Sequence, residues 1–415
     1  MMGADGQGRY GDPAGKNAEI EVLRGAAVVF VLMSHIAVTA PWGNWAWLRR
    51  LETLFSFWAG VDLFFCISGF VVSKSIVSAI DGARLRGRSN VWLVVQSFWI
   101  RRAFRLLPTA YLWVSLTVMF TLVANQSGAF GDAGSVLRQG AAILIYAYNI
   151  YVYHLIDIGA EIRALGPFWS LSLEEQFYIL FPAFLLVVRG QVRVAVLIAL
   201  IAAQAMVDRK DPSLWIYLRT DAMMIGVLIY LFSGTPTFEG LRTAYSGVQR
   251  RWRLIVAIAL SMLLLAAFSL ARQAGVPAFS AVALSAGALV FVAALEVGSV
   301  LPKLPTSLLL WFGARSYGLY IIHLPIFRLN QEVWWQTGMM ERAPYILVVM
   351  SAVTLLVIAS EANFRCVELP LRRIGRRVAD NRTSKGLAFL CDNSSARTFP
   401  ETLRPSSRPS SQPPA

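Results

Sequence analysis

The sequence is short of charge. Only 15% of its 415 residues are Asp, Glu, Lys or Arg, whereas 56% are apolar, and a soluble domain carries about 25% charged residues. A chain this poor in charge cannot cover a water-facing surface of that size, so lipid must cover much of it. Several apolar runs, such as 254–271 and 277–295, reach the roughly 17–25 residues that a helix needs to cross a bilayer. The composition therefore predicts an integral membrane protein.

Cysteine and acidic residues are also scarce. The cysteines form no metal-ligand or disulfide pattern, so we expect no metal site and take all three as structural: they are Cys66, Cys366 and Cys391. The shortage of acids leaves a formal net charge of +14. The arginines gather at the ends of apolar runs, which is typical of cytoplasmic loops and of contact with anionic lipid headgroups. No nucleic-acid motif accompanies them, so we expect membrane lipid, and no nucleic acid, as a partner.

The apolar runs predict about ten membrane helices in an all-α, polytopic fold. The candidate spans are residues 20–39, 56–78, 106–124, 169–188, 192–207, 214–233, 254–271, 277–297, 307–328 and 344–364. An eleventh stretch, 139–153, is shorter and carries several tyrosines. If it does not cross, most arginine clusters fall on one side, so the positive-inside rule favours ten spans with both termini in the cytoplasm. Residues 125–168 are then an outer segment with an interfacial or re-entrant piece.

Three regions follow from this map. Residues 1–18 are Gly-rich and polar and predict a disordered cytoplasmic leader, and residues 19–378 form the transmembrane domain. Residues 379–415 are rich in Ser, Pro, Arg and Asn and predict a disordered cytoplasmic tail. The basic residues that this map places outside, against the rule, are Arg49, Arg50, Arg209 and Lys210.

The first span contains two ionisable residues, Arg24 and His35. Such groups are costly in a bilayer and usually face a cavity or a partner. Eleven helical steps separate them by about 16 Å and leave both on one face. Histidine is the usual general base for deprotonating a hydroxyl, so His35 is a candidate base. The alternatives are that His35 bonds to a neighbouring helix and that Arg24 extends toward the headgroups.

A cluster of arginines stands where the third span meets the cytoplasm: Arg101, Arg102 and Arg105. Guanidinium groups bind phosphate oxygens in pairs. The cluster therefore suits a polyphosphate ligand, although topology and lipid headgroups would also explain it.

Carboxylates enter two spans. The fourth span opens with Glu174 and Glu175, two acids in succession, of which a capping box with Ser172 would explain only Glu175. The second span carries Asp62, which either orients a base or pairs with a cation, followed by small residues that permit close helix packing. We therefore regard both glutamates, and Asp62, as candidate site residues.

The ninth span adds Tyr317 and His323, six residues apart. His323 is a second histidine within the membrane region. A buried histidine of the helix core is the alternative interpretation.

Together these segments resemble the acyltransferase 3 family of membrane acyltransferases, which includes enzymes that O-acetylate bacterial surface polysaccharides. Seven pieces occur in family order: LRGA at 23–26 before His35, GVDLFF at 60–65 with SGF at 68–70, RRAFR at 101–105 with Pro108, WSLSLEEQFY at 169–178, RTDA at 219–222 with Gly226, SYGLY at 316–320 with His323 and Pro325, and ELP at 368–370. The family's arginine–ten–histidine motif falls on Arg24 and His35. Departures from the pattern occur at Glu21-Val22 and Leu369.

The resemblance implies ten helices in a bacterial plasma membrane and acyl transfer to a hydroxyl of a glycan or another small-molecule acceptor. The donor is expected to be acyl-CoA, most simply acetyl-CoA, as a co-substrate with no permanently bound cofactor. The arginine cluster would hold its phosphates and His35 would act as base. Arg24 would position the thioester arm or the base, and Glu174 or Glu175 would orient the acceptor.

A transporter or acyl-group translocase without transferase chemistry is the alternative function, since it would also need ionisable groups within the membrane. Such proteins favour helices broken near the midplane. Residues 25–38 contain no proline and only Gly25, which favours the transferase.

Overall fold

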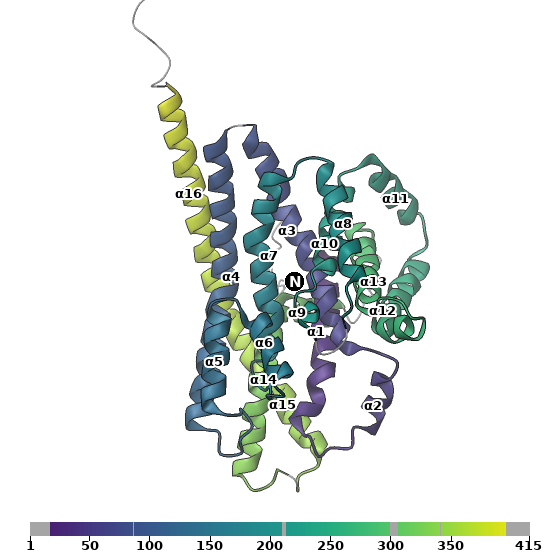
Figure 1. The fold of residues 1–415 in the computed structure, drawn as a ribbon, viewed down its shortest axis with the longest axis vertical. Helices are drawn as coiled ribbons and strands as arrows, with labels where there is room; N and C mark the ends of the chain where they lie inside the picture. The colour runs from purple at the N-terminus through teal and green to yellow at the C-terminus, as the bar shows by residue number, and fades with distance from the viewer. Residues whose placement is uncertain (1–16, 86, 210–212, 299–305, 341, 396–415) are drawn as a thin grey trace, which may run out of the picture.

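The computed structural model describes residues 17–85, 87–209, 213–298, 306–340 and 342–395, and within these ranges every regular element is helical. Figure 1 shows long helices packed side by side, with shorter ones at the lower end and along one flank. The all-α, polytopic prediction is confirmed.

The long helices build most of the bundle. They are α1 (Ala18–His35), α3 (Gly60–Arg84), α4 (Arg88–Val123), α7 (Phe168–Val187), α8 (Val192–Met206), α10 (Asp221–Ser233), α12 (Arg250–Gln273), α13 (Ala278–Ala294), α14 (Thr306–Gln336), α15 (Tyr345–Asn363) and α16 (Leu369–Ser395). Short helices connect them: η1 (Ile36–Thr39), α2 (Ala46–Glu52), η2 (Phe57–Ala59), α5 (Ala133–Leu144), α6 (Tyr148–Asp157), α9 (Leu214–Tyr217), α11 (Pro236–Ser246) and the π-helical turn η3 (Phe364–Glu368).

Seven helical segments of the described residues are long and apolar enough to cross a bilayer: Ala18–Thr39, Phe57–Arg84, Asn90–Val123, Phe168–Val187, Leu214–Ser233, Arg250–Gln273 and Tyr345–Arg382. The shorter apolar helices α8 and α13 match two more predicted spans, and α14 matches the ninth. Each of the ten predicted spans is therefore helical, although 214–233 is divided between α9 and α10. The count of ten crossings and the cytoplasmic placement of the termini remain predictions.

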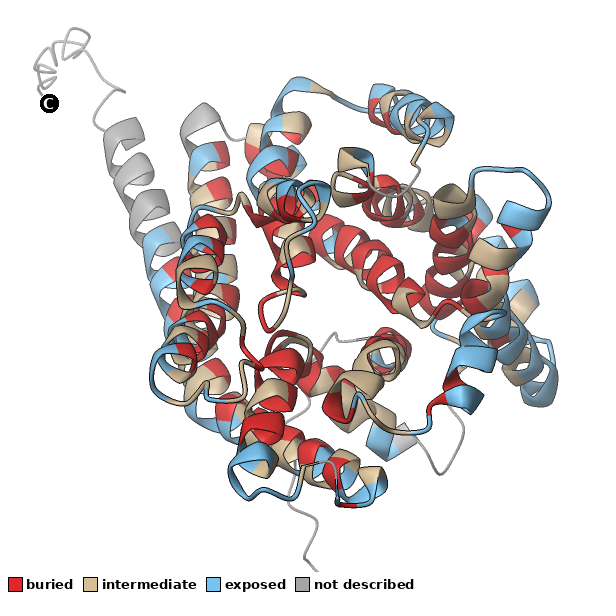
Figure 2. Ribbon diagram, turned by 60° about the horizontal axis from the view of Figure 1, so that its bottom comes forward, coloured by how far each residue is buried: buried red, intermediate tan, exposed pale blue. Residues whose placement is uncertain are grey.

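Apolar side chains cover the outside of the bundle. Figure 2 shows buried residues along its middle and exposed ones at its periphery. On α8, α12 and α15 large side chains stay exposed, such as Ile198, Ile255 and Met350. Water would penalise such surfaces and lipid would not, so these helices face lipid.

The stretch 139–153 is divided between two short helices. α5 ends at Leu144 and α6 begins at Tyr148, and between them Tyr146 has a φ of 57°. At 12 residues, α5 is the longer of the two, and about 18 Å of helix is well short of the roughly 30 Å hydrocarbon core. Neither helix is long enough to cross alone, which fits an interfacial or re-entrant segment.

The C-terminal helix is longer than predicted. A disordered tail was expected from residue 379, but α16 continues to Ser395, so that expectation is wrong for 379–395. Ala379 is fully buried, and its carbonyl accepts a hydrogen bond from Ser97 of α4. No proline occurs between 379 and 395, so nothing breaks the helix there. The rest of the tail and residues 1–16 of the leader lie outside the described residues.

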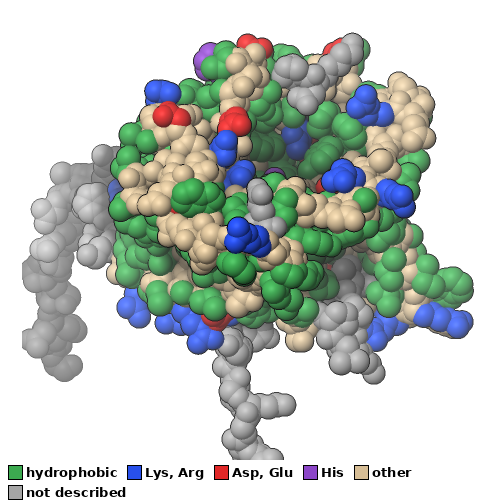
Figure 3. Space-filling view, turned by 90° about the horizontal axis from the view of Figure 1, so that it is seen from below, with side chains coloured by type: hydrophobic (Ala, Val, Ile, Leu, Met, Phe, Trp, Pro, Cys, Tyr) green, Lys and Arg blue, Asp and Glu red, His purple; other side chains and the backbone are tan. Residues whose placement is uncertain are grey.

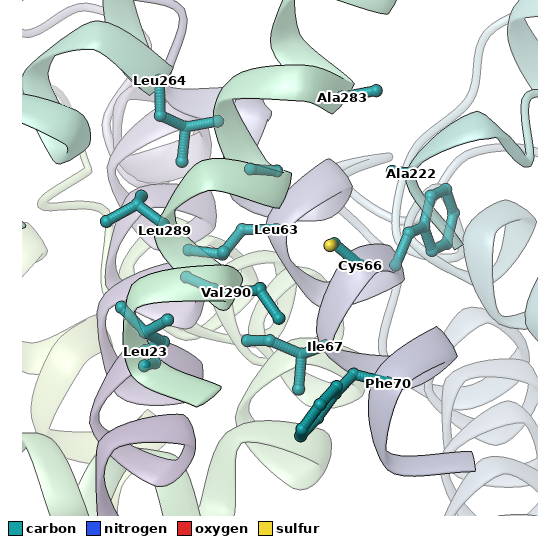
Figure 4. Close-up of a cluster of buried hydrophobic side chains, with 14 of the residues drawn as sticks. Leu23, Leu63, Cys66, Ile67, Phe70, Ala222, Leu264, Ala283, Leu289 and Val290 are labelled. Atoms are coloured by element: carbon teal, nitrogen blue, oxygen red, sulfur yellow. The ribbon is translucent and has the colours of Figure 1, made fainter. Parts of the chain in front are cut away.

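Reciprocal glycines bring two helix pairs into backbone contact. A Cβ at Gly69 of α3 would lie 2.0 Å from the Met223 carbonyl oxygen of α10, and one at Gly226 of α10 would lie 2.0 Å from the Cys66 carbonyl oxygen of α3. Only glycine permits this approach. Figure 4 shows the apolar cluster beside it, with side chains from α1, α3, α10, α12 and α13.

A second pair of glycines, each facing a backbone carbonyl of the other helix, joins α1 to α14. A Cβ at Gly25 would lie 2.2 Å from the Leu309 carbonyl oxygen, and one at Gly313 would lie 2.0 Å from the Glu21 carbonyl oxygen. The helix that carries Arg24 and His35 is thereby fixed against the helix that carries Tyr317 and His323.

Candidate active site

A narrow cavity lies among α1, α3, α4, α7 and α14. Its volume is about 70 Å³, and each water needs roughly 10–15 Å³ of such space, so it has room for about five to seven waters or a small ligand group. Its polar wall consists of Arg24, Arg102, Arg105, Ser68, Ser170, Glu174, Tyr178, Ser316, Tyr317 and Tyr320. Most of these residues come from the segments that the sequence singled out.

Three arginines form a basic wall of the cavity. Arg24 donates to Glu21 at 3.1 Å, and the Arg102 guanidinium lies 4.5 Å from the centre of the Tyr178 ring. The Nε of Arg105 is buried and has no hydrogen-bond partner among the described residues. A buried donor without a partner costs free energy, so this atom is available to an anionic ligand.

Arg101 does not join this wall. It is 41% exposed and its guanidinium lies 4.0 Å from Asp380 of α16. Consecutive residues are about 100° apart around a helix, so α4 cannot turn both Arg101 and Arg102 toward the cavity. The predicted cluster therefore contributes two of its three arginines, and Arg24 supplies the third.

Glu174 lies at the centre of a small polar network in the same cavity. Its carboxylate accepts hydrogen bonds from the hydroxyls of Ser68 and Tyr178. A second contact joins the hydroxyls of Ser170 and Tyr320 at 2.6 Å. Ser170, Glu174 and Tyr178 repeat every four residues of α7 and so share one face.

Tyr178, Ser170 and Tyr320 were not predicted as site residues, and Ser68 was assigned only to helix packing. The four-residue spacing of Ser170, Glu174 and Tyr178 is the sequence signal from which the first two could have been identified. Tyr317, which was predicted, lines the cavity and donates from its hydroxyl to the Leu106 carbonyl at 2.6 Å.

Glu175 and Ser172 differ from the prediction. Glu175 is buried but does not line the cavity, and its Oε1 has no partner among the described residues. α7 begins at Phe168 without a side-chain cap, so the capping box of Ser172 and Glu175 is wrong. The next residue, Gln176, donates to the Tyr146 carbonyl at 2.7 Å and so ties the outer segment to α7.

The two membrane histidines meet just beyond the cavity. Nδ1 of His35 and Nε2 of His323 are 3.4 Å apart, and the ring centroids are 5.1 Å apart. Neither imidazole lines the cavity, but Tyr320, which does, lies one turn before His323 with its ring centroid 6.0 Å away. Two residues proposed separately from the sequence thus form one pair.

Contacts with backbone carbonyls determine which ring nitrogen of each neutral histidine carries the proton. Nδ1 of His35 lies 3.0 Å from the Val31 carbonyl oxygen, and Nδ1 of His323 lies 2.7 Å from that of Tyr320. Carbonyl oxygens only accept hydrogen bonds, so each Nδ1 carries the proton. Nε2 of His35 then has a lone pair, and no described residue hydrogen bonds to it, which is the state that a general base requires.

Asp62 has a structural partner. It is fully buried and pairs in bidentate fashion with Arg219, with both N–O distances at 3.1 Å. The Arg219 guanidinium also lies over the rings of Trp58 and Trp169. Of the two roles left open for Asp62, the structure shows the ion pair with a cation.

A second buried ion pair explains one exception to the charge map. Arg209 is 6% exposed and pairs with Asp221 at 2.9 Å, so it presents little positive charge to either side of a membrane. Arg49 and Arg50 are exposed on α2, and Lys210 lies outside the described residues.

A family model described as an acyltransferase domain matches residues 17–361, which include the cavity and both histidines. The chain belongs to the acyltransferase 3 family. The match confirms the resemblance seen in the sequence motifs, and the acyltransferase 3 domain accounts for most of the chain.

Two curated proteins illustrate what this acyltransferase 3 chain is similar to. The peptidoglycan O-acetyltransferase OatA of Listeria monocytogenes is 28% identical over 390 residues, which cover 86% of this chain and 56% of the relative. The O-acetyltransferase OatA of Staphylococcus aureus is 24% identical over 376 residues, covering 86% of this chain and 57% of the relative. The chain thus spans little more than half the length of these relatives. No solved structure matches it.

Proposed function

We propose that the protein is a membrane O-acyltransferase that moves an acyl group, most simply acetyl, from acyl-CoA to a hydroxyl of a glycan or small-molecule acceptor. The family and the O-acetyltransferase names of the relatives support this activity. The single observation that carries it is the cavity between α1 and its neighbours, which has a basic wall and approaches a pair of histidines.

The basic wall suits the phosphates of the donor. Arg24, Arg102 and Arg105 line the cavity together, and guanidinium–phosphate contacts are strong and bidentate. Arg24 and His35 stand about 16 Å apart along α1, so an extended thioester arm bound at the arginines would point along the cavity toward the base.

Glu174 suits the donor arm better than the acceptor. It shares the narrow cavity with Arg102 and Arg105, and its partners Ser68 and Tyr178 present hydroxyls to whatever fills that space. We therefore assign to Glu174 and these hydroxyls the orientation of the polar groups of the arm.

The reaction needs one base and a departing thiolate. Nε2 of His35 takes the proton of the acceptor hydroxyl while the hydroxyl oxygen bonds to the thioester carbonyl carbon. The carbon–sulfur bond breaks, and the thiolate leaves and recovers the proton from the imidazole. His323 keeps the His35 ring in place, since its Nε2 faces the Nδ1 of His35. The products are an ester and CoA.

The alternative is a transporter or acyl-group translocase. The span 214–233 is interrupted between α9 and α10, but the break holds Arg219 in its ion pair with Asp62. α1 runs without a break from Ala18 to His35, whereas transporters build their central sites from interrupted helices.

Arginine variants test the donor assignment. Arg102→Gln and Arg105→Gln should each weaken acyl-CoA binding by about 10–100-fold, because a hydrogen bond to a charged group contributes about 1.5–3 kcal/mol. Arg101→Gln, from the same helix but outside the cavity, is the matched control and should change affinity less than twofold. The measurement is titration of the purified, folded protein with acetyl-CoA. Unchanged affinity in the Arg102 and Arg105 variants would refute the assignment.

A further inference from the structure

One end of the narrow cavity is basic, and two tyrosines mark it. On α14 the Tyr317 hydroxyl donates to the carbonyl of Leu106, the neighbour of Arg105, at 2.6 Å. On α7 the Tyr178 ring centre lies 4.5 Å from the Arg102 guanidinium. Both tyrosines line the cavity together with these two arginines. Tyr317 and Tyr178 therefore belong to its arginine end.

The same two helices identify the far end of the cavity. Tyr320 follows Tyr317 by three residues on α14, in the direction of His323, and Ser170 precedes Tyr178 by about two turns on α7. The hydroxyls of Ser170 and Tyr320 are 2.6 Å apart. The ring centroids of Tyr320 and His323 are 6.0 Å apart. The far end of the cavity therefore lies directly before the imidazoles.

An aromatic pair narrows this far end. Phe64 of α3 lines the cavity, and its ring packs edge to face on Tyr320 with the centroids 5.8 Å apart and the planes at 74°. Phe64 is half-buried and packs against two separate apolar clusters, one around α3 and α13 and one around α4 and α14. We call Phe64 and Tyr320 the aromatic constriction.

The constriction stands between the arginines and the histidines. α1 and α14 touch at Gly25 and Leu309 and again at His35 and His323, so they run in the same direction. A donor arm that starts at the arginines meets the two rings before its thioester reaches His35. Beyond the histidines α14 continues to the face seen in Figure 3, which is hollowed at its centre. The constriction does not stand between the imidazoles and that face.

The space at the constriction is small. The whole cavity measures about 70 Å³, enough for a small ligand group. The Tyr320 ring is held by the bond from its hydroxyl to Ser170, so Phe64 is the side chain that must move for a larger group. Extra methylenes in a packed site force side chains out of their preferred rotamers, and a single methylene changes selectivity by about tenfold or more.

We propose that Phe64 and Tyr320 select the acyl chain of the donor: the constriction admits an acetyl group to His35 and excludes longer chains. Phe64 is the specificity-determining residue, and Tyr320 is the fixed wall that it faces. This inference rests on the proposed function and adds the chain length of its donor and the residues that set it.

The experiment compares acyl-CoA molecules of different chain length. The full chain, purified in nanodiscs of zwitterionic lipid, is titrated with free CoA, acetyl-CoA, butyryl-CoA and hexanoyl-CoA, and binding to empty nanodiscs is subtracted. Binding is measured because it requires no acceptor. The wild type should bind hexanoyl-CoA about tenfold or more weakly than acetyl-CoA, with butyryl-CoA between them.

Variants of α3 make the test specific. Phe64→Ala should bring the affinity for hexanoyl-CoA to within about twofold of that for acetyl-CoA, and Phe64→Leu, a milder change for folding, should give part of this effect. Phe70→Ala is the matched control. Phe70 also packs edge to face on a tyrosine, Tyr230, at 6.3 Å, and it is buried but does not line the cavity. Its loss should leave the ratio of affinities unchanged.

Two further measurements separate the ring from the hydroxyl and the acyl group from the phosphates. Tyr320→Phe keeps the ring and should keep the preference for acetyl-CoA. The affinity for free CoA should stay within about twofold of wild type in every variant, because the guanidinium–phosphate contacts are untouched.

Several outcomes would overturn the inference. Equal affinity of the wild type for all three acyl chains would do so, as would an equal loss for all three in the Phe64 variants. A change of selectivity in Phe70→Ala as large as that in Phe64→Ala would assign the effect to packing in general. Binding without discrimination refutes the inference alone, whereas no binding of CoA or any acyl-CoA refutes the donor of the proposed function and the inference with it.

Discussion

At the scale of the residue, the proposed proton transfer depends on the pair His35 and His323. Both Nδ1 atoms are occupied by carbonyls of their own helices, at Val31 and Tyr320. Only His35 combines a lone pair on Nε2 with a partly exposed ring, since His323 is completely buried. The two rings are therefore not equivalent, which favours the proposal that His35 is the base and His323 positions it.

Substitution of the two histidines should show this difference. His35→Ala should lower kcat by about 10²–10⁴, the usual contribution of general-base catalysis, and leave acetyl-CoA affinity close to wild type. His323→Ala should lower kcat less and alter the pH dependence of kcat, because His35 loses the ring that faces its Nδ1. Steady-state kinetics from pH 5 to 9 on folded protein measure both effects.

The reverse order would contradict the assignment. If His323→Ala abolishes transfer while His35→Ala stays within a few-fold of wild type, the base belongs to α14. Loss of activity in both variants, with acetyl-CoA affinity retained, would instead indicate a site in which both imidazoles transfer protons, and Arg24 would need another role.

The sequence predicted those site residues whose chemical role can be recognised without knowing their contacts. The sequence indicated Arg24, His35, Glu174 and His323 because ionisable groups stand out in apolar runs. It could not show that Asp62 pairs with Arg219, since 157 positions separate them and only the fold brings α3 to the start of α10. It missed Tyr178, Ser170 and Tyr320 because neutral hydroxyls are common in membrane helices and acquire meaning only from a shared cavity.

At the scale of the element, the contact between α1 and α14 determines whether the histidines meet. Gly25 and Gly313 allow the two backbones to touch, and His35 and His323 lie further along the same pair of helices. Any side chain inserted at these glycines must push the helices apart, because the atoms opposite are backbone carbonyls that cannot rotate away.

Gly313→Ala should therefore affect both stability and activity. Its Cβ would lie 2.0 Å from the Glu21 carbonyl oxygen, and overpacking of this kind costs about 1–3 kcal/mol. We expect a lower Tm in detergent and a reduced kcat, since the separation of the two imidazoles increases. Gly240→Ala is the matched control, because nothing lies within 4 Å of that Cβ in the exposed helix α11. A Gly313→Ala protein with wild-type Tm and kcat would show that the contact does not hold the site together.

Elements were predicted well where hydropathy alone defines them. The ten predicted spans are helical, with 214–233 divided between α9 and α10, because an apolar run in lipid must satisfy its backbone hydrogen bonds within itself. The ends of the helices were less predictable. α16 continues past residue 379 since Ala379 packs against α4, a tertiary contact that the polar composition of this stretch does not reveal.

At the scale of the whole molecule, basic residues from separate helices gather in one region. Arg84 donates to the carbonyls of Leu185 and Leu186, and Arg193 pairs with Asp81. The ends of α3 and α7 and the start of α8 therefore meet in one basic region. The short helices α5 and α6 and their loops, between α4 and α7, belong to the segment predicted to face outward.

Cysteine labelling tests this orientation directly. In a background with Cys66, Cys366 and Cys391 replaced by serine, Ile158→Cys should react with a membrane-impermeant maleimide in intact cells, whereas Val248→Cys should react only after permeabilisation. Both positions are exposed, at 60% and 37%, so lack of reaction reports sidedness and not burial. α7, α8 and the α9–α10 segment separate them, and three crossings place them on opposite sides.

Reaction of both from outside would mean that one of the three does not cross. The simplest candidate is α8, whose 15 residues give about 22 Å of helix against the roughly 30 Å of the hydrocarbon core. The reverse pattern, with Val248→Cys alone labelled, would invert the topology and put α5 and α6 on the cytoplasmic side.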